Sequence, residues 1–169
     1  VPEYLQARGA GADYAGTRGF WFRTEGGLVR NPVACPELPD EMVPMPDRSL
    51  FSADQIVGPR GLVEIEITRG CRFYCSHCQM DLAAGLYEDE QLVFLRRRPV
   101  AAVVKEIEFL RTAYPAMRGL RVGGCTFPLD EAYLTEFAAA LPGPTRVPMV
   151  VRVKTSEMTS AMAALLRQA

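Results

Sequence analysis

The pattern of hydrophobic and polar residues is most regular after Gly61, where strand-like and helix-like segments follow one another three times. Residues 62–68, LVEIEIT, alternate apolar and polar side chains, which predicts a strand with two different faces. Residues 120–124 and 149–155 are short, mainly apolar runs of the kind that form two further strands.

A helix is predicted after each of these strands, from apolar residues at helical spacing and from end signals. The first begins at Pro99 and stops at Pro115. The second begins after its cap, Asp130, and ends at residues 142–144, PGP; the third is capped by Thr159 or Ser160. The expected buried faces are Val100, Val103, Val104, Ile107, Leu110 and Tyr114 in the first helix, Leu134, Phe137, Ala138 and Leu141 in the second, and Met162, Leu165 and Leu166 in the third.

Strands that alternate with helices indicate an α/β fold with parallel strands and right-handed crossovers. A sheet covered on both faces would have continuous apolar strands, whereas here polar and apolar residues alternate. The polar positions are Glu64, Glu66, Arg152 and Lys154. The sequence therefore predicts one polar face, either lining a partial (β/α) barrel around a charged ligand or left open to solvent.

The part before Gly61 has a different composition. Residues 18–31 hold two short apolar runs around a turn at 24–27, TEGG, which predicts a β-hairpin. Five prolines between 32 and 46 disfavour both helix and central strand and predict a linker. The predicted domains are thus 1–31, the end of a preceding domain; 32–60, a proline-rich linker; and 61–169, a truncated half barrel.

Composition and net charge limit the kinds of function that we expect for this protein. The chain has 169 residues, 49 % of them hydrophobic, so it is predicted to be globular. Its net charge is −1, so we expect no positively charged surface of the kind that binds nucleic acid. No apolar run reaches the length of about 20 residues that spans a bilayer, and no secretory signal opens the chain. We expect a cytoplasmic protein, and a piece of a longer one, because both ends look cut.

The cysteines carry the clearest chemistry. Three of the five, Cys71, Cys75 and Cys78, stand at the spacing C-x3-C-x2-C, and such crowding in a reducing compartment favours metal binding over disulfides. A structural zinc site normally needs four ligands, so the fourth would be Cys35, Cys125 or His77. An iron–sulfur cluster also takes four thiolates as a rule, and three of them would leave one iron open.

A three-cysteine loop directly after a strand, EIEITRGC, resembles the radical S-adenosylmethionine (SAM) superfamily. The resemblance implies a partial (β/α) barrel in which Cys71, Cys75 and Cys78 bind a 4Fe-4S cluster and His77 lies close to the adenine. It also implies that SAM binds the open iron, and that an electron from the cluster cleaves SAM to a 5′-deoxyadenosyl radical.

Further positions extend this resemblance to SAM binding. Gly123-Gly124-Cys125 is similar to the family's Gly-Gly-Glu run, which holds the SAM amino group, but Cys125 has no carboxylate. If residues 149–155 are a strand that lines a barrel, Arg152 and Lys154 would neutralise the SAM carboxylate or an anionic substrate. Glu64 and Glu66 would face the ribose or the cavity, with the register of the strand deciding their direction.

Residues 18–51 resemble the segment that joins a cobalamin-binding domain to the radical domain, with MVPMPDRSLF as the characteristic phrase. The resemblance implies a cobalamin-dependent transferase of methyl groups, or a radical rearrangement, on a small-molecule or peptide substrate. It also implies an electron donor such as flavodoxin or ferredoxin. About half of a six-unit barrel is present, so we expect the isolated segment to show a three-stranded portion of the sheet and to be inactive or poorly folded.

Two alternatives stay open. Arg97-Arg98-Pro99 followed by a helix is similar to methylthiotransferases of the same superfamily, although solvated residues at a helix start would look the same. A non-enzymatic zinc module would use Cys71, Cys75 and Cys78 with Cys35 or Cys125. It would be colourless and would not respond to SAM.

Overall fold

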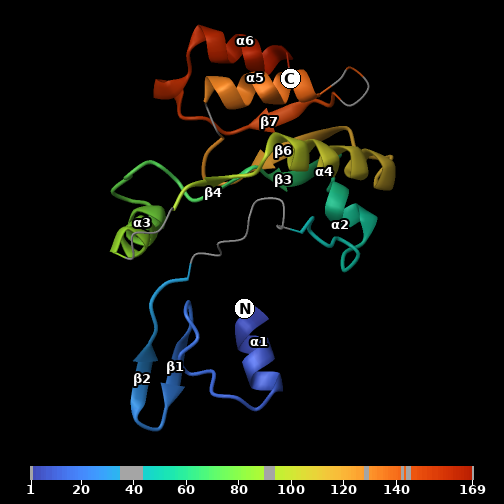
Figure 1. Cartoon of the computed structure of the whole chain (residues 1–169). Coiled ribbons are helices and arrows are strands. Elements are labelled where there is room, and N and C mark those ends of the chain that lie inside the picture. Colours follow the sequence, from blue (N-terminus) through green and yellow to red (C-terminus); the bar gives the residue numbers. More distant parts are fainter. Residues whose placement is uncertain are drawn as a thin grey trace. The chain divides into compact units, whose positions relative to one another are not determined.

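The structure, a computed structural model, describes residues 2–34, 44–89, 94–127, 130–141, 143 and 146–168. The chain divides into two compact units, Val1–Glu37 with Phe73–Phe94, and Leu38–Arg72 with Leu95–Ala169. We call them the hairpin unit and the sheet unit; their elements are labelled in Figure 1. Over the described residues, no helix is long and apolar enough to cross a membrane.

The sheet unit contains a three-stranded parallel sheet in the order β3-β6-β7. β3 (Leu62–Glu66) pairs with β6 (Gly119–Gly123) from Leu62 beside Gly119 to Glu66 beside Gly123. β6 pairs in turn with β7 (Met149–Val151), with Leu120 beside Met149. The predicted α/β fold with a three-stranded portion of parallel sheet is therefore confirmed.

The remaining elements of this unit are mostly helices. They are α2 (Ala53–Val57), α4 (Val100–Ala113), α5 (Glu131–Ala140), the short 3-10 helix η3 (Thr155–Glu157) and α6 (Ser160–Gln168). α5 and α6 lie side by side (Figure 1). A two-stranded antiparallel pair, β4 (Thr68–Arg69) with β5 (Arg96–Arg97), completes the unit.

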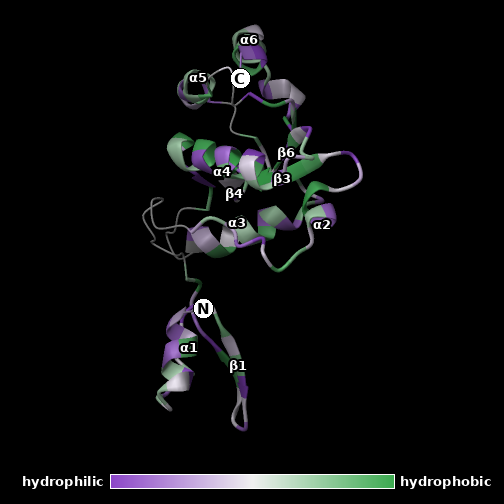
Figure 2. Ribbon diagram, turned by 90° about the vertical axis from the view of Figure 1, so that its right-hand side faces the viewer, coloured by the Kyte–Doolittle hydropathy of each residue, from purple (hydrophilic) through white to green (hydrophobic). Residues whose placement is uncertain are grey.

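One face of the sheet forms the hydrophobic core, because every second residue of the strands is apolar and the helices bring apolar stripes against it. The fully buried side chains include Val63, Ile65, Leu120, Ile107, Leu110, Leu134 and Phe137, all in one cluster. In Figure 2 the strands β3 and β6 are coloured mainly as hydrophobic. The expected buried faces of α4 and α5 are confirmed, with Val104 and Tyr114 partly buried against this core.

The other face is polar, as the alternation predicts. Glu64 and Glu66 on β3 are exposed, and Arg121 lies beside Glu64 on β6. The sheet unit therefore presents charged side chains on the face that its helices leave uncovered.

The helix ends follow the predicted signals. Asp130 caps α5 by accepting a hydrogen bond from the Tyr133 N–H at 2.9 Å. Thr159 does the same for α6 through the Met162 N–H at 3.2 Å. α4 begins directly after Pro99. The predicted stop of the second helix at Pro142 and Pro144 lies outside the described residues.

Two predicted strands are shorter than the sequence pattern suggested. The first was expected over 62–68, but β3 ends at Glu66 and Thr68 begins β4, which pairs with β5 instead. The third was expected over 149–155, but β7 ends at Val151. β3 ends where its neighbour β6 ends, at Gly123, after which Gly124 takes a φ of 106°. β7 ends one residue earlier along β6, with Val151 beside Val122.

The hairpin unit contains α1 (Pro2–Gly9), β1 (Trp21–Thr24), β2 (Gly27–Arg30) and α3 (Gln79–Asp89). The predicted hairpin is confirmed, since β1 and β2 pair antiparallel with Thr24 opposite Gly27. α3 was not predicted, and no residue of α1 is buried. Figure 2 accordingly colours α1 as a mixture of hydrophilic and hydrophobic residues.

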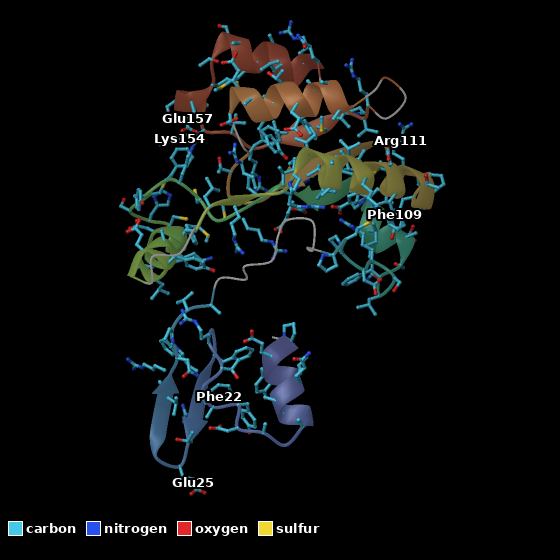
Figure 3. The ribbon with its side chains drawn as sticks, viewed as in Figure 1. Phe22, Glu25, Phe109, Arg111, Lys154 and Glu157 are labelled. Atoms are coloured by element: carbon cyan, nitrogen blue, oxygen red, sulfur yellow. The ribbon has the colours of Figure 1, made fainter. Side chains whose placement is uncertain are left out.

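Aromatic rings join α1 to the hairpin. Tyr4 lies 5.0 Å from Phe20 and 5.9 Å from Phe22, and Tyr14 lies 5.4 Å from Tyr4, measured between ring centroids. Figure 3 shows Phe22 in this region and Glu25 at the tip of the hairpin. Asn31 fixes the connecting loop, because its side-chain amide donates to the carbonyls of Ala15, Thr17 and Phe20 at 2.7 to 3.1 Å.

The predicted linker is only partly described. Residues 35–43, with Cys35 among them, lie outside the described residues. In the described part of the linker, Ala53–Val57 forms α2. A capping box between Ser52 and Gln55 stabilises the start of this helix. The boundaries proposed from sequence at residues 31 and 60 stay a prediction.

Candidate functional site

The ends of the three parallel strands bring several predicted residues to one edge of the sheet, where α/β folds usually bind their ligands. Gly70 and Cys71 follow β3 and β4, Gly123 ends β6, and Arg152 follows β7. All of them belong to the sheet unit, so their arrangement is that of one compact body.

Hydrogen bonds tie these strand ends together. The Thr68 hydroxyl, which is buried, donates to the Thr126 carbonyl at 2.5 Å. The Phe127 N–H donates to the Arg152 carbonyl at 3.1 Å. The loop after β6 is therefore joined to the start of β4 on one side and to the residue after β7 on the other.

Gly124 is required by the geometry of this loop. Its φ is 106°, a conformation that residues with a side chain rarely adopt. A Cβ at this position would stand 2.8 Å from the Thr68 carbonyl oxygen. At Gly123 a Cβ would stand 2.8 Å from the Glu64 Oε1, which is the end of a side chain that can move, so the close backbone approach is that of Gly124 to β4.

A hollow of about 410 Å³ lies beside Gly124. Its lining residues are Glu66, Thr68, Arg69, Gly70, Gly124 and Cys125. The side chains of Glu66 and Arg69 stand 3.6 Å apart and are more than half exposed, so this pair is weak and open to a ligand. The hollow combines exposed backbone at glycines with one carboxylate and one guanidinium.

A second hollow of about 230 Å³ is lined by Thr68, Arg72, Leu95, Arg97, Thr126, Phe127 and Asp130. Arg72 forms a 2.7 Å ion pair with Glu157 of η3. Arg97 lies 3.3 Å from Asp130. The pKa of Asp130 lies below its ordinary value, chiefly because its carboxylate accepts the Tyr133 N–H and then because Arg97 is near, while burial opposes the shift. This hollow is therefore lined by two arginines, Arg72 and Arg97, each of which is paired with a carboxylate.

Cys75 and Cys78 stand on one turn that leads into α3. The Cys78 N–H donates to the Cys75 carbonyl at 2.8 Å, and the Asp81 N–H donates to the Cys78 carbonyl at 3.1 Å. The Tyr74 hydroxyl donates to Glu88 on α3 at 2.6 Å, which raises the pKa of Tyr74 and ties the loop to the helix. His77, between the two cysteines, is exposed.

None of the three cysteines of the motif is in a disulfide, and all three are partly buried; Cys125 is also in no disulfide and is exposed. Cys71 belongs to the sheet unit, whereas Cys75 and Cys78 belong to the hairpin unit. Within the described part of the chain, no group of three or more His, Cys, Asp or Glu side chains is gathered as a metal site. The ligand set Cys71, Cys75 and Cys78 therefore stays a prediction.

Arg152 and Lys154 do not lie on a strand, which corrects the basis of their assignment. β7 ends at Val151, and Lys154 is the residue before η3. Their direction therefore cannot be derived from strand alternation. Figure 3 shows Lys154 near Glu157, at the start of the connection to α6.

Sequence reasoning missed the residues that hold the site together. Thr68 and Thr126 carry no recognisable motif. Glu106 did give a signal, because a glutamate stands between Val103 and Ile107 on the apolar face of α4, where it is fully buried.

Comparison with solved structures identifies a common fold. The radical SAM methyltransferase TsrM from Kitasatospora setae, with tryptophan substrate and the SAM analogue aza-SAM bound, matches 98 % of this chain at 25 % identity with a TM-score of 0.68. TsrM with cobalamin and a [4Fe-4S] cluster bound matches 98 % at 22 % identity with a TM-score of 0.63.

This chain spans about a third of TsrM, 33 % and 34 % in the two structures. No protein-family model and no curated protein matches the chain. The likeness supports the cobalamin-dependent branch of radical SAM proteins at the level of the fold, a partial radical SAM fold of parallel strands and helices.

Proposed function

We propose that this chain forms the cluster-binding part of a radical SAM enzyme, with Cys71, Cys75 and Cys78 as the three protein ligands of a 4Fe-4S cluster. The observation that carries the proposal is the C-x3-C-x2-C loop, which follows the first parallel strand, β3, and the short β4, in a chain that matches TsrM over 98 % of its length.

The donor set fits such a cluster. The three cysteines are in no disulfide, partly buried and close in sequence, and Cys75 and Cys78 are joined by one hydrogen-bonded turn. Thiolates are the usual ligands of iron–sulfur clusters, and three of them leave one iron for SAM. When bound, the cluster would supply the electron that cleaves SAM, fed by a donor such as flavodoxin or ferredoxin.

The chain's own residues would bind and orient SAM. Gly124 lines the 410 Å³ hollow, and Gly123 directly precedes it at the end of β6. His77 is proposed to contact the adenine, and Arg152 and Lys154 the SAM carboxylate or an anionic substrate. Because a side chain at Gly124 would collide with the Thr68 carbonyl, Gly124→Val is expected to abolish SAM binding.

The finer proposal is cobalamin-dependent methyl transfer to a small-molecule or peptide substrate. It is supported by the resemblance of residues 18–51 to the segment after a cobalamin domain, and by TsrM, whose structures hold cobalamin and a SAM analogue. A methylthiotransferase-like activity would use the same cluster and differ in the group transferred.

Cysteine variants test the ligand set. After anaerobic reconstitution with iron and sulfide, Cys71→Ser, Cys75→Ser and Cys78→Ser should each lose bound iron, whereas Cys125→Ser should keep it. A zinc module predicts a different pattern: tight zinc without iron uptake, and loss of zinc also when Cys35 or Cys125 is replaced.

A further inference from the structure

A buried carboxylate in the sheet unit holds two arginines against one edge of the sheet. Glu106 of α4 is fully buried. Its Oε1 lies 2.7 Å from Arg48 Nη2, and its Oε2 accepts a hydrogen bond from Arg98 Nη1 at 2.6 Å. The two arginine side chains are only 11 % and 20 % exposed, so the group is shielded from water.

The same arginines also bind the backbone of β3. Arg48 Nη2 donates to the Glu64 carbonyl at 3.1 Å, and Arg98 Nη1 donates to the Glu66 carbonyl at 2.9 Å. The Arg98 N–H donates to the Ile67 carbonyl at 2.8 Å. The carbonyls of Glu64 and Glu66 in β3, and that of Ile67 directly after it, are therefore satisfied by two residues that belong to no strand.

β3 is the terminal strand of its sheet among the described residues, with β6 on one side only. The unpaired carbonyls of such an edge must find other donors, or they attract another strand. Arg48 and Arg98 donate at this edge in place of a neighbouring strand, and Glu106 holds both guanidinium groups in position.

We propose that Glu106, Arg48 and Arg98 form a clamp that positions the end of β3, and with it the loop that begins at Cys71. The clamp joins three parts of the chain: Arg48, which precedes α2; Arg98 and Glu106, of which the first lies between β5 and α4 and the second within α4; and β3 itself. It thereby fixes the strand end from which the proposed cluster ligands follow; this consequence for the cluster rests on the proposed function, while the effect on β3 does not.

The clamp has two arms, the side chains of Arg98 and Arg48, and they bind β3 and Glu106 with different strength. The Arg98 side chain makes one hydrogen bond with Glu106 and one with the Glu66 carbonyl of β3, while its bond to the Ile67 carbonyl comes from the backbone N–H and does not depend on the side chain. Arg48 has a buried amino group, Nη1, without a hydrogen-bond partner in the described part of the chain. Loss of the Arg98 arm should therefore free the end of β3 more than loss of the Arg48 arm.

Hydrogen exchange on the full chain tests the clamp. Glu106→Gln removes the charge that holds both arginines, and amide exchange in residues 62–69 and 44–51 should speed up about tenfold or more, the change expected for one lost charged hydrogen bond. Glu108→Gln, an exposed glutamate on the same helix, is the matched control and should leave both segments unchanged.

A triple variant separates positioning from stability. Arg48→Met, Arg98→Met and Glu106→Leu together replace the buried ions by apolar side chains, an exchange that often preserves or raises stability. The clamp predicts a melting temperature close to that of the parent chain but fast exchange in 62–69, and an altered electron paramagnetic resonance line shape of the reconstituted cluster. Unchanged exchange in the triple variant would overturn the proposal.

The cluster readout is independent of the exchange readout. If the parent chain takes up no iron, the proposed function fails, and exchange in 62–69 still decides the effect of the clamp on β3. If the cluster forms and its line shape is the same in the parent, Glu106→Gln and triple variants, the clamp has no influence on the cysteine loop, and that part of the proposal is wrong.

Discussion

The interactions that stabilise the sheet unit differ from those that stabilise the hairpin unit. In the sheet unit, aliphatic and aromatic side chains from strands and helices form one continuous core, and Ile67, Leu110 and Phe137 are fully buried. In the hairpin unit, α1 has no buried residue, and four aromatic rings and the amide of Asn31 hold the segments together. The sheet unit is therefore stabilised mainly by buried apolar area, and the hairpin unit by a few specific contacts.

This difference implies different responses to substitution. Stability that comes from a large buried core is lost steeply when volume is removed, because cavities add to the lost transfer free energy. Stability that comes from hydrogen bonds and exposed ring contacts is lost locally and in smaller steps.

Phe137→Ala should have the largest effect, because it empties a fully buried position at the centre of the core. We expect a loss of about 3–5 kcal/mol in the free energy of unfolding. Chemical denaturation measures it. Phe109→Ala removes a ring that is 46 % exposed on α4 and should change stability by less than about 1 kcal/mol; equal losses for the two variants would refute the core as described.

Asn31→Ala should affect the hairpin unit alone. It leaves three carbonyls without their donor, which corresponds to about 1–3 kcal/mol if they stay unpaired. Hydrogen exchange should speed up in residues 15–22 while residues 119–123 of β6 keep their protection. A loss of protection in both segments would mean that the two units unfold together.

Asp130→Ala should cost about 1 kcal/mol, the usual value for the loss of a helix N-cap. Because the pKa of Asp130 is lowered in the folded chain, its contribution is present above the ordinary pKa of a free aspartate and is lost as pH falls through the folded value. The difference in melting temperature between parent and variant should therefore vanish in acid. Glu131→Gln is the control, and a difference that persists at low pH would contradict the cap.

Glu88→Gln should have the smallest effect. The carboxylate of Glu88 accepts the Tyr74 hydroxyl and raises the pKa of Tyr74, so the variant should return this pKa toward its ordinary value. A pH titration of the Tyr74 ring signals by NMR measures it. No shift would show that the contact between the cysteine loop and α3 does not form in solution.

The sequence predicted the sheet unit far better than the cysteine region. Period-two and helical patterns are set by burial against a core, so they revealed β3, α4 and α5 with their caps. Strand lengths were overestimated at Arg152 and Lys154, because a strand continues only while a neighbour continues, and the end of β6 depends on the backbone of Gly124.

Other features had no pattern from which to predict them. α3 follows the third cysteine without a stripe of buried residues, so periodicity did not reveal it. The bond from Thr68 to Thr126 joins residues far apart in sequence. Cys71, Cys75 and Cys78 were recognised by their spacing and by the strand-like segment before them. Their role as ligands is decided by metal-binding experiments on the protein.

The most direct measurement is electron paramagnetic resonance of the chain after anaerobic reconstitution with iron and sulfide and reduction, recorded with and without SAM. The account predicts the signal of a reduced 4Fe-4S cluster that changes when SAM is added, because one iron is free to bind it, and no such signal in Cys75→Ser. A protein that binds zinc tightly and takes up no cluster, or a cluster whose signal ignores SAM, would contradict the central claim.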